Sequence, residues 1–118
     1  MTSARQVTGQ IGEDAAAAWY VEHGYTIVAR NWRVREGEID IVAANRRDLV
    51  ICEVKTRSSA AFGLPAEAVN FKKQARLRKL ALMFVAMHPQ PGKSLRFDVA
   101  SVMPGRDGAA VEVIEAAF

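Results

Sequence analysis

Residues 40–55 read DIVAANRRDLVICEVK and contain two apolar runs from which the fold can be predicted. The first apolar run begins after Asp40, and the second leads directly into Glu53-Val54-Lys55. The polar segment between the runs, Asn45-Arg46-Arg47, is short enough to connect two antiparallel strands. The second run is apolar on both faces, which indicates a strand that is covered on both sides.

The charged residues at the ends of these strands point to a functional site. Side chains alternate faces along a strand, so Glu53 and Lys55 should point the same way. Burying a carboxylate and an ammonium there is costly unless they are paired or hold a metal. Together with Asp40 on the neighbouring strand, Glu53 and Lys55 form the smallest set of side chains that metal-assisted cleavage of a phosphodiester needs. The spacing alone supports equally well a structural Asp–Lys–Glu ion-pair cluster.

The chemistry of phosphodiester hydrolysis indicates which cofactor to expect. A divalent cation held by carboxylates can activate water and screen the phosphate together. Magnesium suits a site of a few carboxylates and waters, and it needs no histidine or cysteine ligand. We therefore expect Mg²⁺, or Mn²⁺, to bind Asp40 and Glu53, with the backbone carbonyl of Val54 as a third ligand. Lys55 would orient the water or neutralise charge on the phosphate.

The rest of the chain predicts two helices and further strands in one mixed sheet. Residues 1–8 are polar and expected to fray, and Pro89 should end the second helix at the residue before it. The order α-β-β-β-α-β-β predicts an α/β fold with helices packed on a mixed sheet. The predicted elements are a helix from about Gln10 to His23, strands at Tyr25–Arg33, Glu38–Ala44 and Asp48–Thr56, a loop at Ser58–Pro65, a helix from near Ala66 to His88, and strands at Leu95–Met103 and Val111–Ile114.

Composition predicts one compact domain over residues 1–118, since the chain is 50% hydrophobic and too short for two self-sufficient cores. No run of about 18 uncharged apolar residues and no signal-peptide pattern is present, so we expect a cytoplasmic protein without a membrane partner. Cys52 is the sole cysteine, which excludes an intramolecular disulfide and a thiolate zinc site.

Basic residues indicate a polyanionic partner. The formal net charge is +3 and the isoelectric point is near 9.4. Lys72, Lys73 and Arg76 crowd the predicted second helix, and such clustering is typical of binding to a phosphate backbone. Arg57, just past the strand that carries Glu53, is the cation best placed to reach a phosphate at the metal. The alternative is a solvated charged face with no partner.

Several short blocks of sequence occur together in an order typical of one family. They span about residues 9 to 102, and their combination is far more specific than a lone Asp…Glu-x-Lys pattern. The chain resembles the YraN family of small bacterial proteins, which is similar to archaeal Holliday-junction resolvases and belongs with the restriction-endonuclease-like, PD-(D/E)xK superfamily. The blocks are Gly9-x-x-Gly12-Glu13, Asn31-Trp32-Arg33, Gly37-Glu38-Ile39-Asp40, Glu53-Val54-Lys55-Thr56-Arg57, Phe62-Gly63 and Arg96-Phe97-Asp98.

The resemblance implies a restriction-endonuclease-like fold and roles for individual residues. Asp40 and Glu53 match metal-binding carboxylates, and Lys55 matches the catalytic lysine. Glu13 matches a glutamate that resolvase-like members place on the first helix, facing the same metal. Its alternative role is that of an acid stabilised by the N-terminal dipole of the helix. Ile39 stands directly before Asp40, where the motif often has proline, and Glu38 before it could compete with Glu13 for the metal.

Two functions from different classes follow. The first is a metal-dependent nuclease that acts on DNA, including branched structures, as a homodimer if it works as resolvase-like proteins do. The second is a non-catalytic nucleic-acid-binding or scaffold protein that retains the nuclease fold. Substrate cannot be transferred by analogy of fold, so the choice between DNA and RNA stays open.

Overall fold

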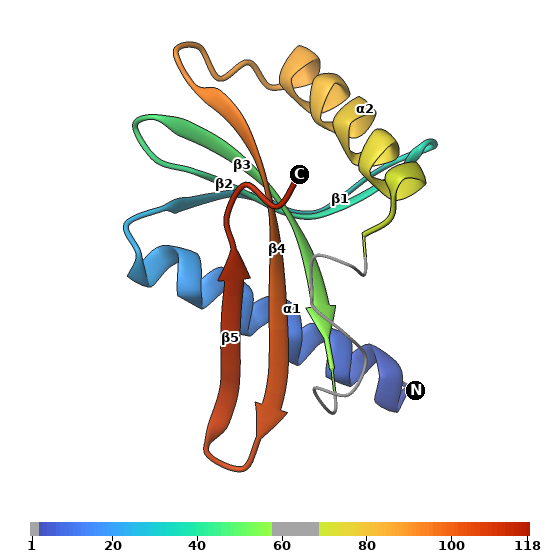
Figure 1. The fold of residues 1–118 in the computed structure, drawn as a ribbon, viewed down its shortest axis with the longest axis vertical. Helices are drawn as coiled ribbons and strands as arrows, with labels where there is room; N and C mark the ends of the chain where they lie inside the picture. Colours follow the sequence, from blue (N-terminus) through green and yellow to red (C-terminus); the bar gives the residue numbers. More distant parts are fainter. Residues whose placement is uncertain (1–2, 58–68) are drawn as a thin grey trace.

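The computed structural model describes residues 3–57 and 69–118 of the chain, and within them a five-stranded sheet lies between two helices (Figure 1). The strands lie in the order β1-β2-β3-β4-β5, and the predicted order of helices and strands along the chain is confirmed. The elements are α1 (Ala4–Glu22), β1 (Thr26–Val34), β2 (Gly37–Ala44), β3 (Asp48–Thr56), α2 (Phe71–Met87), β4 (Ser94–Gly105) and β5 (Gly108–Ile114).

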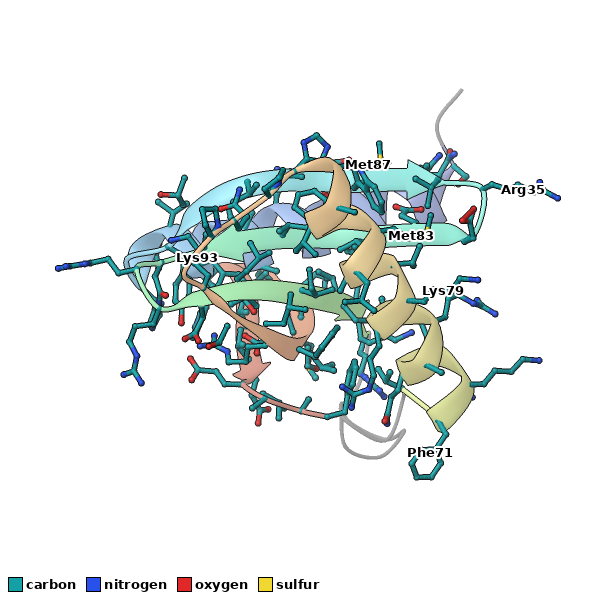
Figure 2. The ribbon with its side chains drawn as sticks, turned by 90° about the horizontal axis from the view of Figure 1, so that it is seen from above. Arg35, Phe71, Lys79, Met83, Met87 and Lys93 are labelled. Atoms are coloured by element: carbon teal, nitrogen blue, oxygen red, sulfur yellow. The ribbon has the colours of Figure 1, made fainter. Side chains whose placement is uncertain are left out.

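The sheet is mixed because one of its four strand pairs is parallel. β3 and β4 run parallel, whereas the other neighbouring strands run antiparallel. A parallel pair needs a crossover, and the chain between these strands carries α2 across one face of the sheet. α1 covers the opposite face (Figures 1 and 2). No helix in the described ranges is long and apolar enough to cross a membrane.

Strand β3 is covered on both faces, as its sequence predicts. Leu49 and Ile51 belong to the core beneath α2, whereas Val50 and Cys52 belong to the core beneath α1. All four side chains are nearly inaccessible to solvent. The bounds of this strand are also those expected from its sequence. β3 is therefore the central element against which both helices pack.

Helix α1 begins earlier than we expected, so the prediction that residues 1–8 are frayed is wrong for the described residues from Ala4 onward. Ser3 caps the helix, because its hydroxyl accepts a hydrogen bond from Gln6 N at 3.1 Å. The Gln6 side chain in turn accepts from Ser3 N at 2.9 Å. This reciprocal pair satisfies N–H groups that the first turn would otherwise leave open. Glu13 consequently lies in the middle of α1, where the dipole of the helix N-terminus does not explain its placement.

Helix α2 begins later than we expected. It starts at Phe71 because Asn70 caps it, with the Asn70 side chain accepting from Lys73 N at 2.9 Å. It ends at Met87, before Pro89, as predicted. The predicted loop at Ser58–Pro65 and the predicted helix start at Ala66 lie outside the described residues.

The close approach of α1 to β3 depends on a glycine. A Cβ atom added to Gly12 would lie 1.8 Å from the Oγ1 atom of Thr56 at the end of β3. A side chain larger than hydrogen would fit there only if Thr56 or the helix moved. This contact sets the position of Glu13, the next residue of α1, relative to the end of β3.

Candidate functional site

Strands β2 and β3 diverge after the pair formed by Ile41 and Cys52, where their backbone pairing ends. Beyond this pair, the backbone N–H of Val54 donates to Asp40 Oδ2 at 2.8 Å. A side-chain oxygen thus takes the place of a strand carbonyl. The hydrogen bond holds Asp40 in the gap between the two strands.

β2, which carries Asp40, and its neighbour β1 both depart from regular strand geometry at Asp40. Ile39 and Ile41 are two residues apart, yet Ile39 packs in the core beneath α2 and Ile41 in the core beneath α1. In a regular strand, residues two apart share a face. On β1, Asn31 has a positive φ of 51° and interrupts the pairing opposite Asp40. Asparagine is among the few residues that adopt this conformation readily. The sheet therefore bends where Asp40 is presented.

Glu53 lies beside this gap and meets two ammonium groups. It is 7% exposed and, like Leu49 and Ile51 before it on β3, it faces α2. Its Oε1 atom lies 3.5 Å from Lys55 Nζ, which confirms that Glu53 and Lys55 share a face. The same oxygen lies 2.6 Å from Nζ of Lys73, which α2 supplies. Glu53 is therefore buried but paired.

The electrostatics of Asp40 reflect this crowding. Burial and the nearby charge of Glu53 raise the pKa of Asp40 to about 7, against the opposing effect of the hydrogen bond from Val54. The charges of Glu38 and Glu13 add smaller contributions in the same direction. Crowded carboxylates of this kind are costly to ionise together, and a bound cation removes the cost.

The Lys55 ammonium is also perturbed. Burial and the neighbouring Lys73 ammonium lower the pKa of Lys55, and they outweigh the attraction of Glu53. Its side chain is 27% exposed, so the end of β3 presents a compact cation that is only partly hydrated. Such a donor stabilises developing negative charge better than a fully solvated one.

The donors at the divergence of β2 and β3 fit magnesium. Asp40 and Glu53 offer carboxylate oxygens from neighbouring strands, and Val54 offers the backbone carbonyl that we expect as a third ligand. Magnesium typically uses one or two carboxylates and completes its shell with water and substrate oxygens. Within residues 3–57 and 69–118, no group of three acidic, histidine or cysteine side chains is placed to hold a metal ion by itself. A divalent cation held by Asp40 and Glu53 would therefore need further ligands from water or substrate.

Glu13 lies on the other face of the sheet from Glu53. It is 8% exposed and accepts hydrogen bonds from Arg30 Nε at 2.8 Å and Asn31 Nδ2 at 3.0 Å. It shares a groove of about 780 Å³ with Asp40, lined also by the first turns of α1. Glu38 lines the same groove, and its Oε2 atom accepts from Arg33 Nε at 3.1 Å. Both candidate third acids are thus paired with cations of β1.

Of the four residues predicted to contact nucleic acid, two line a pocket with the carboxylates of the site and two do not. Lys73 and Arg76 of α2 line a pocket of about 230 Å³ together with Asp40 and Glu53. Lys72 is exposed on the same helix, outside that set of lining residues. Arg57 follows β3, and its backbone N–H donates to Val102 O at 2.8 Å. Figure 2 shows the helix lying across its face of the sheet, with Phe71 at its first turn and Lys79 in its middle. Cations thus border one side of the carboxylates.

Other residues singled out by the sequence have structural roles. Trp32 packs edge-on against Phe84 of α2, with ring centroids 5.3 Å apart, which places it in the core between sheet and helix. Asp98 is fully buried and accepts hydrogen bonds from Arg96 Nε and Tyr20 Oη, at 2.9 and 2.7 Å. Trp32 therefore contributes to packing, and the buried carboxylate of Asp98 has hydrogen-bond partners.

For two residues of the site, sequence reasoning did not identify the contacts that the structure shows. Asn31 supports Glu13 and bends β1, and an asparagine inside a strand pattern was the available signal. Lys73 was expected on a nucleic-acid backbone, whereas the structure places its ammonium on Glu53. No local pattern could reveal this pair, because it joins α2 to β3 across the fold.

Comparisons with known proteins support the resemblance found in the motifs. A family model described as uncharacterised protein family UPF0102 matches residues 12–102, a range that includes Glu13, Asp40, Glu53 and Lys73. A UPF0102 protein of Moorella thermoacetica is 49% identical over 120 residues, with 100% of both chains covered. One from a Parafrankia species is 51% identical over 104 residues, with 88% of each chain covered. One from Frankia alni is 46% identical over 116 residues, covering 98% of this chain and 97% of its own.

Proposed function

The chain belongs to the uncharacterised protein family UPF0102, the YraN family that its motifs indicated, and we propose that it is a metal-dependent nuclease. One observation carries the proposal. Asp40 and Glu53 face a common pocket where β2 and β3 diverge, and Lys55 contacts Glu53 from the same strand. Two buried, crowded carboxylates beside a partly buried lysine suit phosphodiester hydrolysis better than they suit stability, because burial and the charge of Glu53 raise the pKa of Asp40 to about 7.

Each side chain has a defined part in this proposal. Asp40 and Glu53 would hold Mg²⁺ or Mn²⁺, which supplies an activated water and neutralises charge on the phosphate. The hydrogen bond from Val54 keeps Asp40 in its rotamer, so that its other oxygen is available to a ligand. Lys55 donates to an oxygen of the scissile phosphate, where negative charge develops.

The substrate we propose is nucleic acid, and DNA first. Arg76 lines the pocket that contains both carboxylates, and the exposed Lys72 lies on the same helix. A phosphate backbone laid along α2 would meet these cations and reach the pocket at the same time. Branched DNA and a homodimeric enzyme follow from the likeness to resolvases alone, and they belong to the proposal as its more specific form.

A second function rests on one specific observation. Glu53 is paired with the ammonium groups of both Lys55 and Lys73, so its charge is already compensated. Such a cluster suits a non-catalytic protein that binds nucleic acid through α2 and keeps the carboxylates as structural ion pairs. This alternative predicts binding without cleavage.

The experiment that separates the two functions is a cleavage assay. The purified chain is incubated with Mg²⁺ or Mn²⁺ and linear duplex, single-stranded or four-way-junction DNA, with and without chelator. A nuclease cuts at least one substrate, and chelator abolishes the cutting. Binding to DNA without cleavage of any of the three supports the non-catalytic alternative. The Asp40→Asn protein, purified in the same way, reports any contaminating nuclease.

A further inference from the structure

Lys73 forms the shortest ion pair at the site. Its Nζ atom lies 2.6 Å from Glu53 Oε1, whereas Lys55 Nζ lies 3.5 Å from the same atom. Glu53 is only 7% exposed, so without a cation it would be an uncompensated buried charge. α2 therefore supplies the principal counter-ion of Glu53.

The helix cap holds the backbone of Lys73, whereas its side chain is partly exposed. Its N–H donates to the side chain of Asn70 at 2.9 Å as part of the helix cap. The Lys73 side chain is 34% exposed, and its four methylene groups let the ammonium turn towards solvent without displacing the helix. Lys73, Arg76, Asp40 and Glu53 line the same pocket, so a phosphate held there would come within reach of the released ammonium.

We propose that Lys73 is an exchangeable counter-ion that couples metal binding to nucleic-acid binding. It neutralises Glu53 when no divalent cation is present. When Glu53 becomes a metal ligand, Lys73 leaves it and binds a phosphate oxygen of the substrate. This inference rests on the proposed function, because it assumes that Glu53 binds metal. It gives Lys73 a role distinct from the catalytic role of Lys55, because Lys73 is the closer counter-ion of Glu53, at 2.6 Å against 3.5 Å.

The exchange makes two binding events cooperative. In the absence of nucleic acid, a metal ion must displace Lys73 from Glu53, and its affinity is reduced accordingly. A bound phosphate gives Lys73 another partner and removes that competition. Coupling is reciprocal, so metal should raise the affinity for DNA by the same factor by which DNA raises the affinity for metal. We expect a factor of about five or more, the lower end of typical coupling between sites.

The test compares Lys73→Gln with two matched controls that also remove one positive charge. Lys72→Gln changes the neighbouring exposed residue of α2, and Arg76→Gln changes a cation of the same pocket, whereas the ion pairs of Glu53 among the described residues are with Lys55 and Lys73. Affinity for Mg²⁺ is measured by calorimetric titration without DNA. Affinity for a short duplex is measured by fluorescence anisotropy with and without Ca²⁺, which occupies carboxylate sites without requiring cleavage.

The exchange predicts that Lys73→Gln binds Mg²⁺ more tightly than wild type, by about five-fold or more, and loses the effect of Ca²⁺ on DNA affinity. Both controls should keep wild-type Mg²⁺ affinity within about two-fold and keep the Ca²⁺ effect. Lys73→Arg should bind Mg²⁺ more weakly than wild type, because a guanidinium holds a carboxylate through two hydrogen bonds. This variant tests the proposal even if Lys73→Gln fails to fold.

Each other outcome overturns a defined part of the account. An equal gain in Mg²⁺ affinity for Arg76→Gln would mean that any lost charge has this effect, and the exchange would be wrong. Unchanged Mg²⁺ affinity in both Lys73 variants would also overturn it while leaving the nuclease proposal intact. A wild-type protein that binds no divalent cation would overturn both.

Discussion

Asp40 accepts a hydrogen bond of 2.8 Å from the backbone N–H of Val54, so a side chain completes the ladder where β2 and β3 diverge. The bond does two things at once. It satisfies an N–H group that the divergence would leave without a strand partner, and it brings a carboxylate next to Glu53 on β3. The hydrogen bond that completes the strand pairing therefore also positions the Asp40 carboxylate. Ionising this carboxylate beside Glu53 costs free energy.

The first prediction concerns the stability of the metal-free protein as a function of pH. The pKa of Asp40 is raised from an ordinary value near 3.8 to about 7 in the folded state, so the folded state binds the proton more tightly than the unfolded chain does. Wild type should therefore lose stability as pH rises from about 4 to about 7, and level off above. Asp40→Asn keeps an acceptor for Val54 and should be more stable than wild type at pH 8 by about 1–3 kcal/mol.

Urea unfolding in chelator at pH 4.5 and pH 8 measures this difference. Glu38→Gln serves as the control, because Glu38 is paired with Arg33 on the surface of β1 and β2. It should show no comparable gain at pH 8. An Asp40→Asn protein that gains as much at pH 4.5 as at pH 8 would show that ionisation of Asp40 is not the source of the cost.

The second prediction concerns metal binding. Asp40→Asn and Glu53→Gln should each weaken Mg²⁺ binding by about ten-fold or more, because each removes one anionic oxygen from a site with few protein ligands. Calorimetric titration at pH 8 measures the affinity. Circular dichroism must show an intact fold in both variants. Wild-type affinity in both would move the metal site elsewhere.

The third prediction tests the packing that positions α1. Gly12→Ala should destabilise the protein by about 1–3 kcal/mol, because the new methyl group would overlap Thr56 on β3. Gly9→Ala is the matched control, since a Cβ there meets nothing within 4 Å and alanine favours helix. It should be neutral or slightly stabilising in thermal unfolding. Equal effects of the two substitutions would contradict the close contact between α1 and β3.

How much of this structure follows from sequence depends on the range of the interactions. The bounds of β3 were predicted because its apolar residues serve two cores at once, a strictly local signal. The start of α1 was not predicted because the alanine run is the strongest helix signal, while the capping residues Ser3 and Gln6 lie seven or more residues before Glu13. Capping boxes can be read from sequence, so this part was recoverable.

The arrangement at the site was less accessible. Alternation along β3 predicted that Glu53 and Lys55 share a face, and the structure confirms it. The pairing of Glu53 with Lys73 depends on how α2 crosses the sheet, and the bend at Asp40 depends on the left-handed conformation of Asn31. Neither arises from interactions between sequence neighbours, so neither has a signature in spacing or composition.

The fourth prediction concerns the salt dependence of DNA binding. Replacing Lys72 and Arg76 together by alanine should weaken duplex binding at any sequence and reduce the slope of log affinity against log salt by about one unit for each lost phosphate contact. The control replaces Arg46 and Arg47, which are exposed at the turn between β2 and β3, at the other end of these strands from Asp40 and Glu53. It removes the same charge and should keep the wild-type slope. Equal slopes for all three proteins would exclude α2 as the contact.

Single-turnover cleavage by wild type and Lys55→Ala, under saturating Mg²⁺ and protein, decides whether Asp40, Glu53 and Lys55 form the site that cuts. Lys55 should act on the rate and not on binding, because its ammonium lies 3.5 Å from Glu53 and is not needed to pair it while Lys73 is present. We predict that Lys55→Ala binds Mg²⁺ and DNA within a few-fold of wild type and cuts about 10²–10³ times more slowly. Cleavage by Lys55→Ala at the wild-type rate, abolished by chelator in both, would contradict the account.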